Sequence, residues 1–370
     1  MKFNNRKVLI VPLDWGLGHA TRCIPLVKAF LKLNWQVVIA ADGDIEYLLR
    51  KEFPQLQFLK LSGYEVEYSQ SSKWMPLKML AQIPKILSAI RKENEWLNRI
   101  IEQHHIDLVV SDNRYGLYTE KIPCVFITHQ LNIKAPFKWM EKRLQRMNWN
   151  YISKFSECWV PDAEANGLAG DLSHPKELHP FPLRFLGPLS RFKRMMAPIK
   201  YKYLFLISGP EPQRTLLEKK IFESIGDLKD EVVIVRGKPG SSEQFSFASN
   251  INVVNHLDGH ELERVMNSAE YIISRSGYTT VMEVAALQKR SILIPTPGQT
   301  EQEYLANYLY RKGYAYTAVQ DGLSIKDVLQ KAEQFYFREF PMQMNNLDDE
   351  LEDFLQKYFQ PKPEASFATS

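Results

Sequence analysis

The segment from Ser274 to Glu283 combines residue types that could bind a charged ligand. It reads Ser-Arg-Ser-Gly-Tyr-Thr-Thr-Val-Met-Glu, follows the apolar run 271–273 and opens an apolar-periodic stretch. This pattern predicts a strand, a turn of small residues and a helix. Such a helix presents free backbone N–H groups and the positive end of its dipole, which together bind anions. Glu283 lies within the first two turns, so a phosphate on the N–H groups and a sugar hydroxyl on the carboxylate would fit a nucleotide sugar.

Two further loops of the second half follow predicted strands, at the edge where open α/β sheets bind ligands. In the loop 208–214, Ser208 and Gly209 permit close backbone approach and Arg214 could pair with a phosphate. A plain Gly-Pro turn with a surface arginine is the alternative. The third loop, 295–302, places Gln299, Glu301 and Gln302 where they could hydrogen-bond a sugar ring. Its alternative is a capped helix with solvated polar residues.

The first half has its own candidate loop, directly after the strand predicted at 8–13. Gly16 and Gly18 form a turn that leads into a helix, which places His19 at the carboxyl edge of the sheet. Asp112 follows another predicted strand, so His19 could act as a base with Asp112 as its orienting carboxylate. The alternative for Asp112 is an Asx turn or a helix cap. His129, after the strand predicted at 124–128, is a third candidate for the same edge.

Two other kinds of site were weighed against these loops. Gly16 and Gly18 with Asp42 fit part of a dinucleotide-binding fingerprint, but Thr21 stands at the third glycine position, so we disfavour it. Histidine and cysteine spacings of a metal site are absent, and Asp42-Gly43-Asp44 sits beside a helix cap. We therefore expect no metal and no cofactor.

Composition and charge are those of a globular protein with an asymmetric surface. Three scattered cysteines suggest a reducing compartment, and neither a secretory leader nor an 18-residue apolar span is apparent, so we expect a cytoplasmic protein. Residues 1–198 hold 28 Lys and Arg against 19 Asp and Glu, a net +9 within the overall +4. The excess suggests an acidic partner, or simply a solvated basic surface.

Two stretches, 73–80 and 137–144, mix aromatic, methionine and basic residues. They could contact an anionic membrane from its inner face or hold a lipid-linked acceptor. An amphipathic helix packed on its own domain is the alternative. We expect no nucleic-acid partner.

The order of apolar segments predicts two α/β domains joined by one linker. Strands are expected at 8–13, 36–41, 58–61, 108–111, 124–128, 158–160, 203–207, 231–236, 251–255, 271–274 and 291–295. Helices are expected at 20–33, 44–53, 77–104 with a break or kink near Pro84, 214–224, 259–267, over the apolar-periodic segment 281–287, at 301–312 and over much of 325–359. The proline-rich span 180–198 reads as the connection. The domains are then residues 1–190, residues 200–345, and a C-terminal helix and flexible tail over 346–370.

Several of these residues resemble the donor-binding signature of two-domain GT-B glycosyltransferases, in particular the MurG-like group of family 28. The resemblance lies in Ser276-Gly277 with Glu283, in Ile294-Pro295, and in Gln299-Thr300-Glu301-Gln302 followed by Asn307. It is strong over about residues 200–315 and weaker over 1–190. The loop Gly-Leu-Gly-His-Ala-Thr-Arg at 16–22 is similar to the glycine-rich loop of the family, in a form closer to a poorly characterised branch of bacterial and archaeal proteins.

The resemblance implies two doubly wound Rossmann-like domains around a cleft, and assigns a role to each motif. The backbone of Ser276, Gly277 and Tyr278 would hold a diphosphate, and Glu283 the ribose. Gln299 and Glu301, with Gln302 behind them, would face the donor sugar. His256 and Leu257 lie in the segment whose backbone would read the base. The loop 208–214 matches the phosphate loop of the family, although Gly-Pro-Glu-Pro replaces its glycine- and serine-rich run.

The activity implied is transfer of a hexose or N-acetylhexosamine from a nucleotide-diphosphate sugar, UDP-linked by resemblance, to an unidentified acceptor with inversion. Two alternatives stay open from the sequence. One is a sugar-nucleotide 2-epimerase on the same fold, which needs no acceptor. The other is a non-catalytic protein that binds a nucleotide sugar or a lipid.

Overall fold

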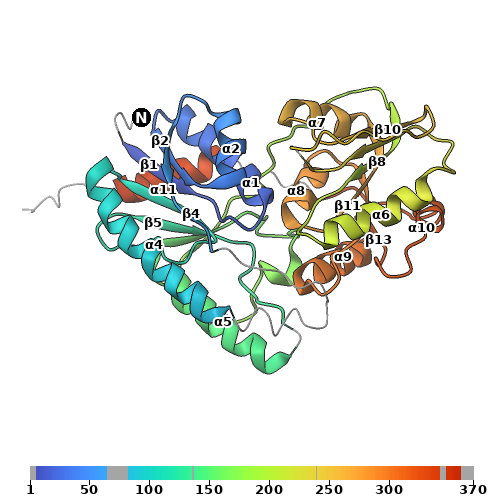
Figure 1. Cartoon of the computed structure of the whole chain (residues 1–370). Coiled ribbons are helices and arrows are strands. Elements are labelled where there is room, and N and C mark those ends of the chain that lie inside the picture. Colours follow the sequence, from blue (N-terminus) through green and yellow to red (C-terminus); the bar gives the residue numbers. More distant parts are fainter. Residues whose placement is uncertain (1–5, 65–81, 136, 239, 342–346, 360–370) are drawn as a thin grey trace, which may run out of the picture.

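Two α/β domains, each built on one parallel sheet, make up the computed structural model (Figure 1). The structure describes residues 6–64, 82–135, 137–238, 240–341 and 347–359. The first sheet has strand order β3-β2-β1-β4-β5-β6-β7 and the second β10-β9-β8-β11-β12-β13. Every strand pair in both sheets is parallel. Both orders contain the doubly wound 3-2-1-4-5-6 pattern, which confirms the predicted fold class.

The first domain holds seven strands and four α-helices within the described residues. Its strands are β1 (Lys7–Val11), β2 (Gln36–Ala41), β3 (Gln57–Lys60), β4 (Leu108–Asp112), β5 (Cys124–Ile127), β6 (Glu157–Val160) and β7 (Leu183–Phe185). Its helices are α1 (Leu17–Lys32), α2 (Gly43–Glu52), α4 (Ile83–His104) and α5 (Lys138–Ile152), with a short 3-10 turn at Gly170–Leu172.

The second domain repeats the alternation. Its strands are β8 (Tyr201–Leu206), β9 (Val232–Val235), β10 (Ile251–Val254), β11 (Ala269–Ser274), β12 (Arg290–Leu293) and β13 (Tyr316–Thr317). Its helices are α6 (Gln213–Ile225), α7 (Gly259–Asn267), α8 (Tyr278–Ala286), α9 (Thr300–Lys312) and α10 (Ile325–Glu333), and the chain continues to α11 (Leu347–Phe359).

Alternation along each strand explains why helices cover both faces of the sheets. Val8 and Ile10 of β1 enter one hydrophobic cluster with the buried side of α1, whereas Leu9 and Val11 enter another with α4 and α5. Side chains of successive strand residues point to opposite faces, so an all-apolar strand needs cover on both. A strand covered on both faces therefore shows itself in the sequence as a continuous apolar run.

The break or kink predicted near Pro84 coincides with the start of α4 at Ile83: Pro84 lies in the first turn, where its missing N–H costs no hydrogen bond, and residues 77–81 lie outside the described ranges. One detail of the predicted connections was wrong. The span 180–198 is not entirely a linker, because Leu183–Phe185 pairs with β6 as the edge strand β7. Helix α5 begins within the stretch 137–144, for which an amphipathic helix was the stated alternative, whereas the short strands β7 and β13 were not predicted as elements.

The C-terminal helix α11 returns to the first domain rather than staying with the second (Figure 1). Phe354 packs edge-to-face on Trp159 of β6, with ring centroids 5.0 Å apart. Arg184 of β7 donates to Glu350, and Lys32 of α1 pairs with Asp348. The chain thus crosses between the domains twice, which restricts how far they can separate.

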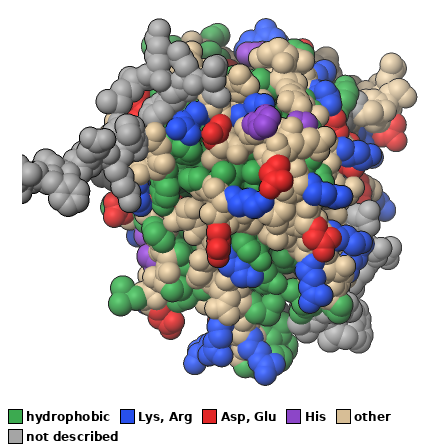
Figure 2. Space-filling view, turned by 90° about the vertical axis from the view of Figure 1, so that its left-hand side faces the viewer, with side chains coloured by type: hydrophobic (Ala, Val, Ile, Leu, Met, Phe, Trp, Pro, Cys, Tyr) green, Lys and Arg blue, Asp and Glu red, His purple; other side chains and the backbone are tan. Residues whose placement is uncertain are grey.

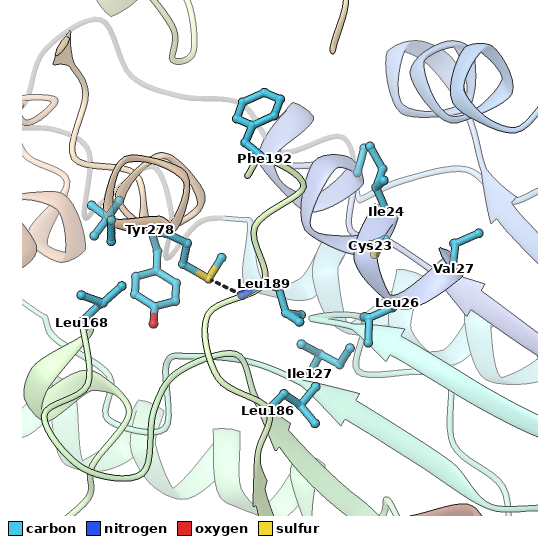
Figure 3. Close-up of a cluster of buried hydrophobic side chains, with 14 of the residues drawn as sticks. Cys23, Ile24, Leu26, Val27, Ile127, Leu168, Leu186, Leu189, Phe192 and Tyr278 are labelled. Carbon is cyan, nitrogen blue, oxygen red and sulfur yellow. Dashed lines mark hydrogen bonds between the residues drawn. The ribbon is translucent and has the colours of Figure 1, made fainter. Parts of the chain in front are cut away.

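Apolar packing also continues from one domain to the other. One buried cluster contains Cys23 and Ile24 of α1 together with Met282 of α8. Figure 3 shows the linker residues Leu189 and Phe192 lying beside α1 and α8. The backbone N–H of Leu189 contacts the sulfur of Met282 at 3.2 Å (Figure 3).

On the face seen in Figure 2, Lys and Arg side chains lie scattered among Asp and Glu side chains. Two aromatic side chains at the start of α5 are exposed to solvent. Phe137 is 56% exposed and Trp139 is 60% exposed. The companion stretch 73–80 lies outside the described residues.

Candidate active site between the two domains

A cleft of about 1250 Å³ lies between the domains, at the carboxyl ends of strands from both sheets. It contains nearly all residues predicted from the sequence. Those that line it are Gly16, Gly18, His19, His129, Ser208, Gly209, Arg214, His256, Leu257, Gly277, Tyr278, Glu283, Gln299, Glu301 and Gln302. Asp112 and Ser276 are fully buried immediately behind the wall. Loops at the strand ends thus bring together residues as far apart in the chain as Gly16 and Gln302.

His19 and Asp112 contact each other as predicted. His19 Nδ1 lies 3.0 Å from Asp112 Oδ2. Burial and then the Arg22 guanidinium lower the pKa of His19, against the opposing effect of Asp112, so the neutral imidazole is favoured. Burial alone would raise the pKa of Asp112, but Arg22 and His19 reverse this and bring it to about 2. The arrangement is a neutral base beside an ionised carboxylate.

Arg22 joins this pair, and sequence reasoning gave it no role. Its Nε donates to Asp112 Oδ2 at 2.9 Å and its Nη2 pairs with Asp112 Oδ1. Arg22 Nη1 also lies 3.5 Å from His129 Nδ1. Its position could have suggested this role. Arg22 lies three residues after His19, a spacing that puts both side chains on the same face of a helix.

In the second domain, α8 begins at the cleft with its first turn uncapped by any side chain. Gly277 is the N-cap, so the amides that follow it are the unsatisfied donors of a helix start. Ser276 does not offer its hydroxyl to the cleft, because its Oγ donates to the carbonyl of Gln302 at 2.8 Å. The ring of Tyr278 stacks on His129 with centroids 4.2 Å apart, and its hydroxyl donates to the carbonyl of Pro161 (Figure 3 shows its position). Only backbone from these two residues is left for a ligand.

Beside this helix start, two buried polar atoms lack partners. Arg275 is 2% exposed and its Nε makes no hydrogen bond, nor does Thr296 Oγ1. Both atoms lie 3.9 Å from the point where a side chain on Gly209 would begin. Gly209 has φ +110°, which favours glycine, and so leaves that space open.

Arg275 is also a buried cation without a counter-charge. Its guanidinium donates to the carbonyls of Ile294 and Gln213 and to the Gln320 amide oxygen, and no described carboxylate pairs with it. Burial accordingly lowers the pKa of Arg275 to about 10. Buried charges are normally paired, so an uncompensated one at a cleft wall indicates a place for an anion.

Glu283 also lines the cleft, with 5% exposure. Its Oε1 accepts from Arg191 Nε, on the interdomain connection, at 2.9 Å. Burial raises the pKa of Glu283, and Arg191 opposes this only in part. The carboxylate is thus held in place by one cation, with its second oxygen available to hydroxyl donors.

Glu301 connects the two walls of the cleft. His129 Nε2, from the first domain, lies 2.7 Å from Glu301 Oε1, and Gln130 donates to Glu301 Oε2. Burial would raise the pKa of Glu301, but His129, together with Arg22 and His19, reverses this and lowers the pKa. Thr279 adds a second link, since its hydroxyl donates to the carbonyl of Gly18 at 3.1 Å.

Arg214 and Gln302 of the predicted donor site also make contacts within the protein. The Arg214 guanidinium bonds Glu211, Glu218 and the carbonyl of Arg236, so these contacts already use its donors. The side chain of Gln302 closes the neighbouring loop, with its Oε1 accepting from the N–H of Thr296 at 2.9 Å.

Within the described ranges, no three His, Cys, Asp or Glu side chains gather as a metal site would require. No helix in the same ranges is long and apolar enough to cross a bilayer.

Comparisons with known proteins agree with this geometry. Residues 211–357 match the family model of the glycosyltransferase family 28 C-terminal domain. An uncharacterized glycosyltransferase of Methanosarcina acetivorans is 26% identical over 333 residues, which cover 83% of this chain and 82% of the relative. The UDP-N-acetylglucosamine–N-acetylmuramyl-(pentapeptide) pyrophosphoryl-undecaprenol N-acetylglucosamine transferase of Haemophilus ducreyi is 23% identical over 88% of each chain. The solved structure of the glycotransferase of kitacinnamycin has a TM-score of 0.66 and 13% identity, covering 97% of this chain and all of that one.

The fold and the matches define a glycosyltransferase with the GT-B architecture. More particularly, the second domain is similar to the glycosyltransferase family 28 C-terminal domain, and the chain as a whole is similar to MurG-like transferases.

Proposed function

We propose that the second domain binds a nucleotide-diphosphate sugar, UDP-linked, and that the first domain transfers its hexose or N-acetylhexosamine to an acceptor hydroxyl. The observation that carries the donor assignment is the unpaired cation Arg275 with its two partnerless atoms, beside the uncapped start of α8. A diphosphate there would accept hydrogen bonds from the Gly277 helix start, Arg275 Nε and Thr296 Oγ1. Ribose hydroxyls would donate to Glu283, and the base would lie against His256 and Leu257.

In the reaction we propose, His19 Nε2 removes the proton of the acceptor hydroxyl. The oxygen forms a bond to the anomeric carbon while the bond from that carbon to the diphosphate oxygen breaks. A single displacement of this kind inverts the anomeric centre. The departing diphosphate gains negative charge, which Arg275 and the positive end of α8 stabilise, and one such preorganised donor is worth roughly 3 kcal/mol.

The acceptor half of the cleft supports an apolar or aromatic portion next to the reacting hydroxyl. Leu13, Trp15, Tyr64, Ile86, Tyr115 and Ile133 line this half. The buried indole N–H of Trp15 has no hydrogen-bond partner and could donate to an acceptor oxygen. A lipid-linked acceptor fits this surface.

We also propose a peripheral contact with an anionic membrane through the start of α5. Phe137 and Trp139 stack on each other in solvent, beside Lys138, Lys142 and Arg143. Exposed aromatics with basic neighbours suit the interface of an anionic bilayer. Co-sedimentation with vesicles containing anionic lipid should fall when both aromatics are changed to serine, and unchanged sedimentation would exclude this contact.

The donor assignment is tested by calorimetry with UDP, UMP and uridine. We expect UDP to bind much more tightly than uridine, and Thr296→Val to reduce this difference while uridine affinity stays the same. Thr317→Val, in the same sheet but outside the cleft, should change nothing. Equal affinities for UDP and uridine in the wild type would contradict a diphosphate site.

A panel of nucleotide sugars in a thermal-shift assay then identifies the donor, because a ligand that binds only the folded state raises its apparent stability. Product analysis with the donor alone separates transfer from epimerisation, since an epimerase needs no acceptor.

A further inference from the structure

Arg22 is positioned to control the orientation and protonation of the groups that surround His19. It is 2% exposed and approaches Asp112 with two nitrogens, Nε at 2.9 Å from Oδ2 and Nη2 on Oδ1. Asp112 is fully buried at the end of β4, and His19 lies on the same helix face as Arg22. A two-point contact of this kind fixes the plane of a carboxylate.

We propose that Arg22 is a positioning residue for glycosyl transfer, which holds Asp112 so that His19 carries its proton on Nδ1 and presents an unprotonated Nε2 to the acceptor. This inference rests on the proposed function of His19 as the base. Arg22 itself touches no reacting atom.

The proton count around Arg22 leads to this tautomer. Nη2 carries two N–H bonds, and one is directed at Asp112 Oδ1. The other donates to the amide oxygen of Asn113 at 2.9 Å, in the amide orientation that also lets Asn113 donate to Thr128. His19 Nδ1 lies 2.8 Å from the same Nη2, so Asn113 and His19 Nδ1 compete for this second N–H.

When this N–H of Arg22 is directed at Asn113, His19 Nδ1 is the donor in its 3.0 Å contact with Asp112 Oδ2. In the opposite tautomer, a lone pair on Nδ1 would face a carboxylate oxygen at this distance, which is repulsive. With the proton on Nδ1, Nε2 is the basic nitrogen, and no described residue hydrogen-bonds to it.

Removing Arg22 would change this arrangement in two ways. Asp112 would lose the contact that fixes its plane, so the preference for the Nδ1–H tautomer would weaken. The pKa of His19 would also rise, because a nearby positive charge disappears while the carboxylate remains. The charged and titratable groups around His19 are Arg22 and Cys23 of α1, Asp112 of β4, His129 after β5, and Glu301 of α9.

The experiment is two-bond ¹H–¹⁵N NMR of the full chain labelled with ¹⁵N-histidine, recorded over a pH series. His19→Gln identifies the His19 signals. We expect nearly all wild-type His19 in the Nδ1–H form at pH 8, and a clearly smaller fraction in Arg22→Gln, since the hydrogen bond made by one ring nitrogen sets the tautomer and its carboxylate partner is no longer fixed. The His19 midpoint should also move to higher pH in Arg22→Gln.

Arg22→Gln leaves a buried carboxylate unpaired and could unfold the protein, so Arg22→Lys provides a second variant. Lysine keeps the charge but has one nitrogen, so it cannot make the two-point contact. We expect Arg22→Lys to lose the tautomer preference as well. Lys28→Gln, on an exposed turn of α1, removes a charge from the same helix and should leave tautomer and midpoint as in the wild type.

A wild-type His19 in the Nε2–H form overturns the proposal, as does an Arg22→Lys protein with the wild-type tautomer. UDP calorimetry on the same samples tests the donor assignment separately from the role of Arg22. Failure of the wild type to bind UDP refutes the donor assignment without affecting the tautomer result, and an unchanged tautomer refutes the role of Arg22 without affecting donor binding.

Discussion

Replacing Glu283 by Gln should weaken UDP binding by roughly 30-fold. The carboxylate is 5% exposed, lines the cleft and is held by Arg191 at 2.9 Å. A hydrogen bond from a ribose hydroxyl to a charged acceptor is worth about 1.5–3 kcal/mol. The amide of glutamine fills the same volume but is a neutral acceptor that also leaves Arg191 without its counter-charge. A net loss of about 2 kcal/mol corresponds to that change in Kd.

Isothermal titration calorimetry with UDP measures this directly, without knowledge of the acceptor. Glu52→Gln is the matched control, because Glu52 also lines the cleft but pairs with Lys28 at its edge. Its Kd for UDP should remain within about twofold of the wild type. If Glu283→Gln binds UDP as tightly as the wild type, the ribose assignment fails, whatever the result for the control.

Three further predictions follow from the cleft. His19→Ala should abolish transfer while UDP affinity is kept, because the base removes a proton and contacts no donor phosphate; loss of UDP affinity would contradict this. The pKa of Asp112 is depressed in the folded state to about 2, so its contribution to stability is present above an unfolded pKa of about 3.9 and is lost as pH falls towards 2. Acid unfolding of Asp112→Asn should accordingly be less steep over that window than in the wild type. Gly18→Val should weaken the domain contact, because even a Cβ there would lie 3.0 Å from Thr279 Oγ1; small-angle scattering would show a larger radius of gyration, and an unchanged radius would refute it.

Much of the fold could be predicted because it depends on local pattern. The bounds of β2 and α7 were predicted to the residue, since β2 is the uninterrupted apolar run 37–41 preceded by Gln36, and Asp258 forms a capping box with Glu261. Strand β7 was missed because its three residues, between prolines, carry too little signal and are ordered only by pairing with β6.

The positions of the cleft residues could be predicted, but their contacts could not. His19 and Glu283 follow strand ends, so topology alone places them in the cleft. The pairing of Glu301 with His129 depends on how the two domains face each other, which no local pattern encodes. For Arg214 the residue type alone suggested a phosphate ligand. In the structure it instead forms an ion pair with Glu218, four residues later on the same helix.

The return of α11 to the first domain is another contact that composition could not reveal. Its apolar residues Leu351, Phe354 and Leu355 indicated an amphipathic helix, but not which domain it would cover. Trp159 and Phe30 belong to the same cluster as Phe354, so the first domain would expose apolar surface without this helix.

A crystal structure with bound UDP is the most direct test of the central claim that the cleft grips a pyrophosphate. We predict the diphosphate against the Gly277 amides and within hydrogen-bond distance of Arg275 Nε, with the ribose on Glu283. A cleft that stays empty at saturating UDP, or a nucleotide bound away from Gly277 and Arg275, would contradict it.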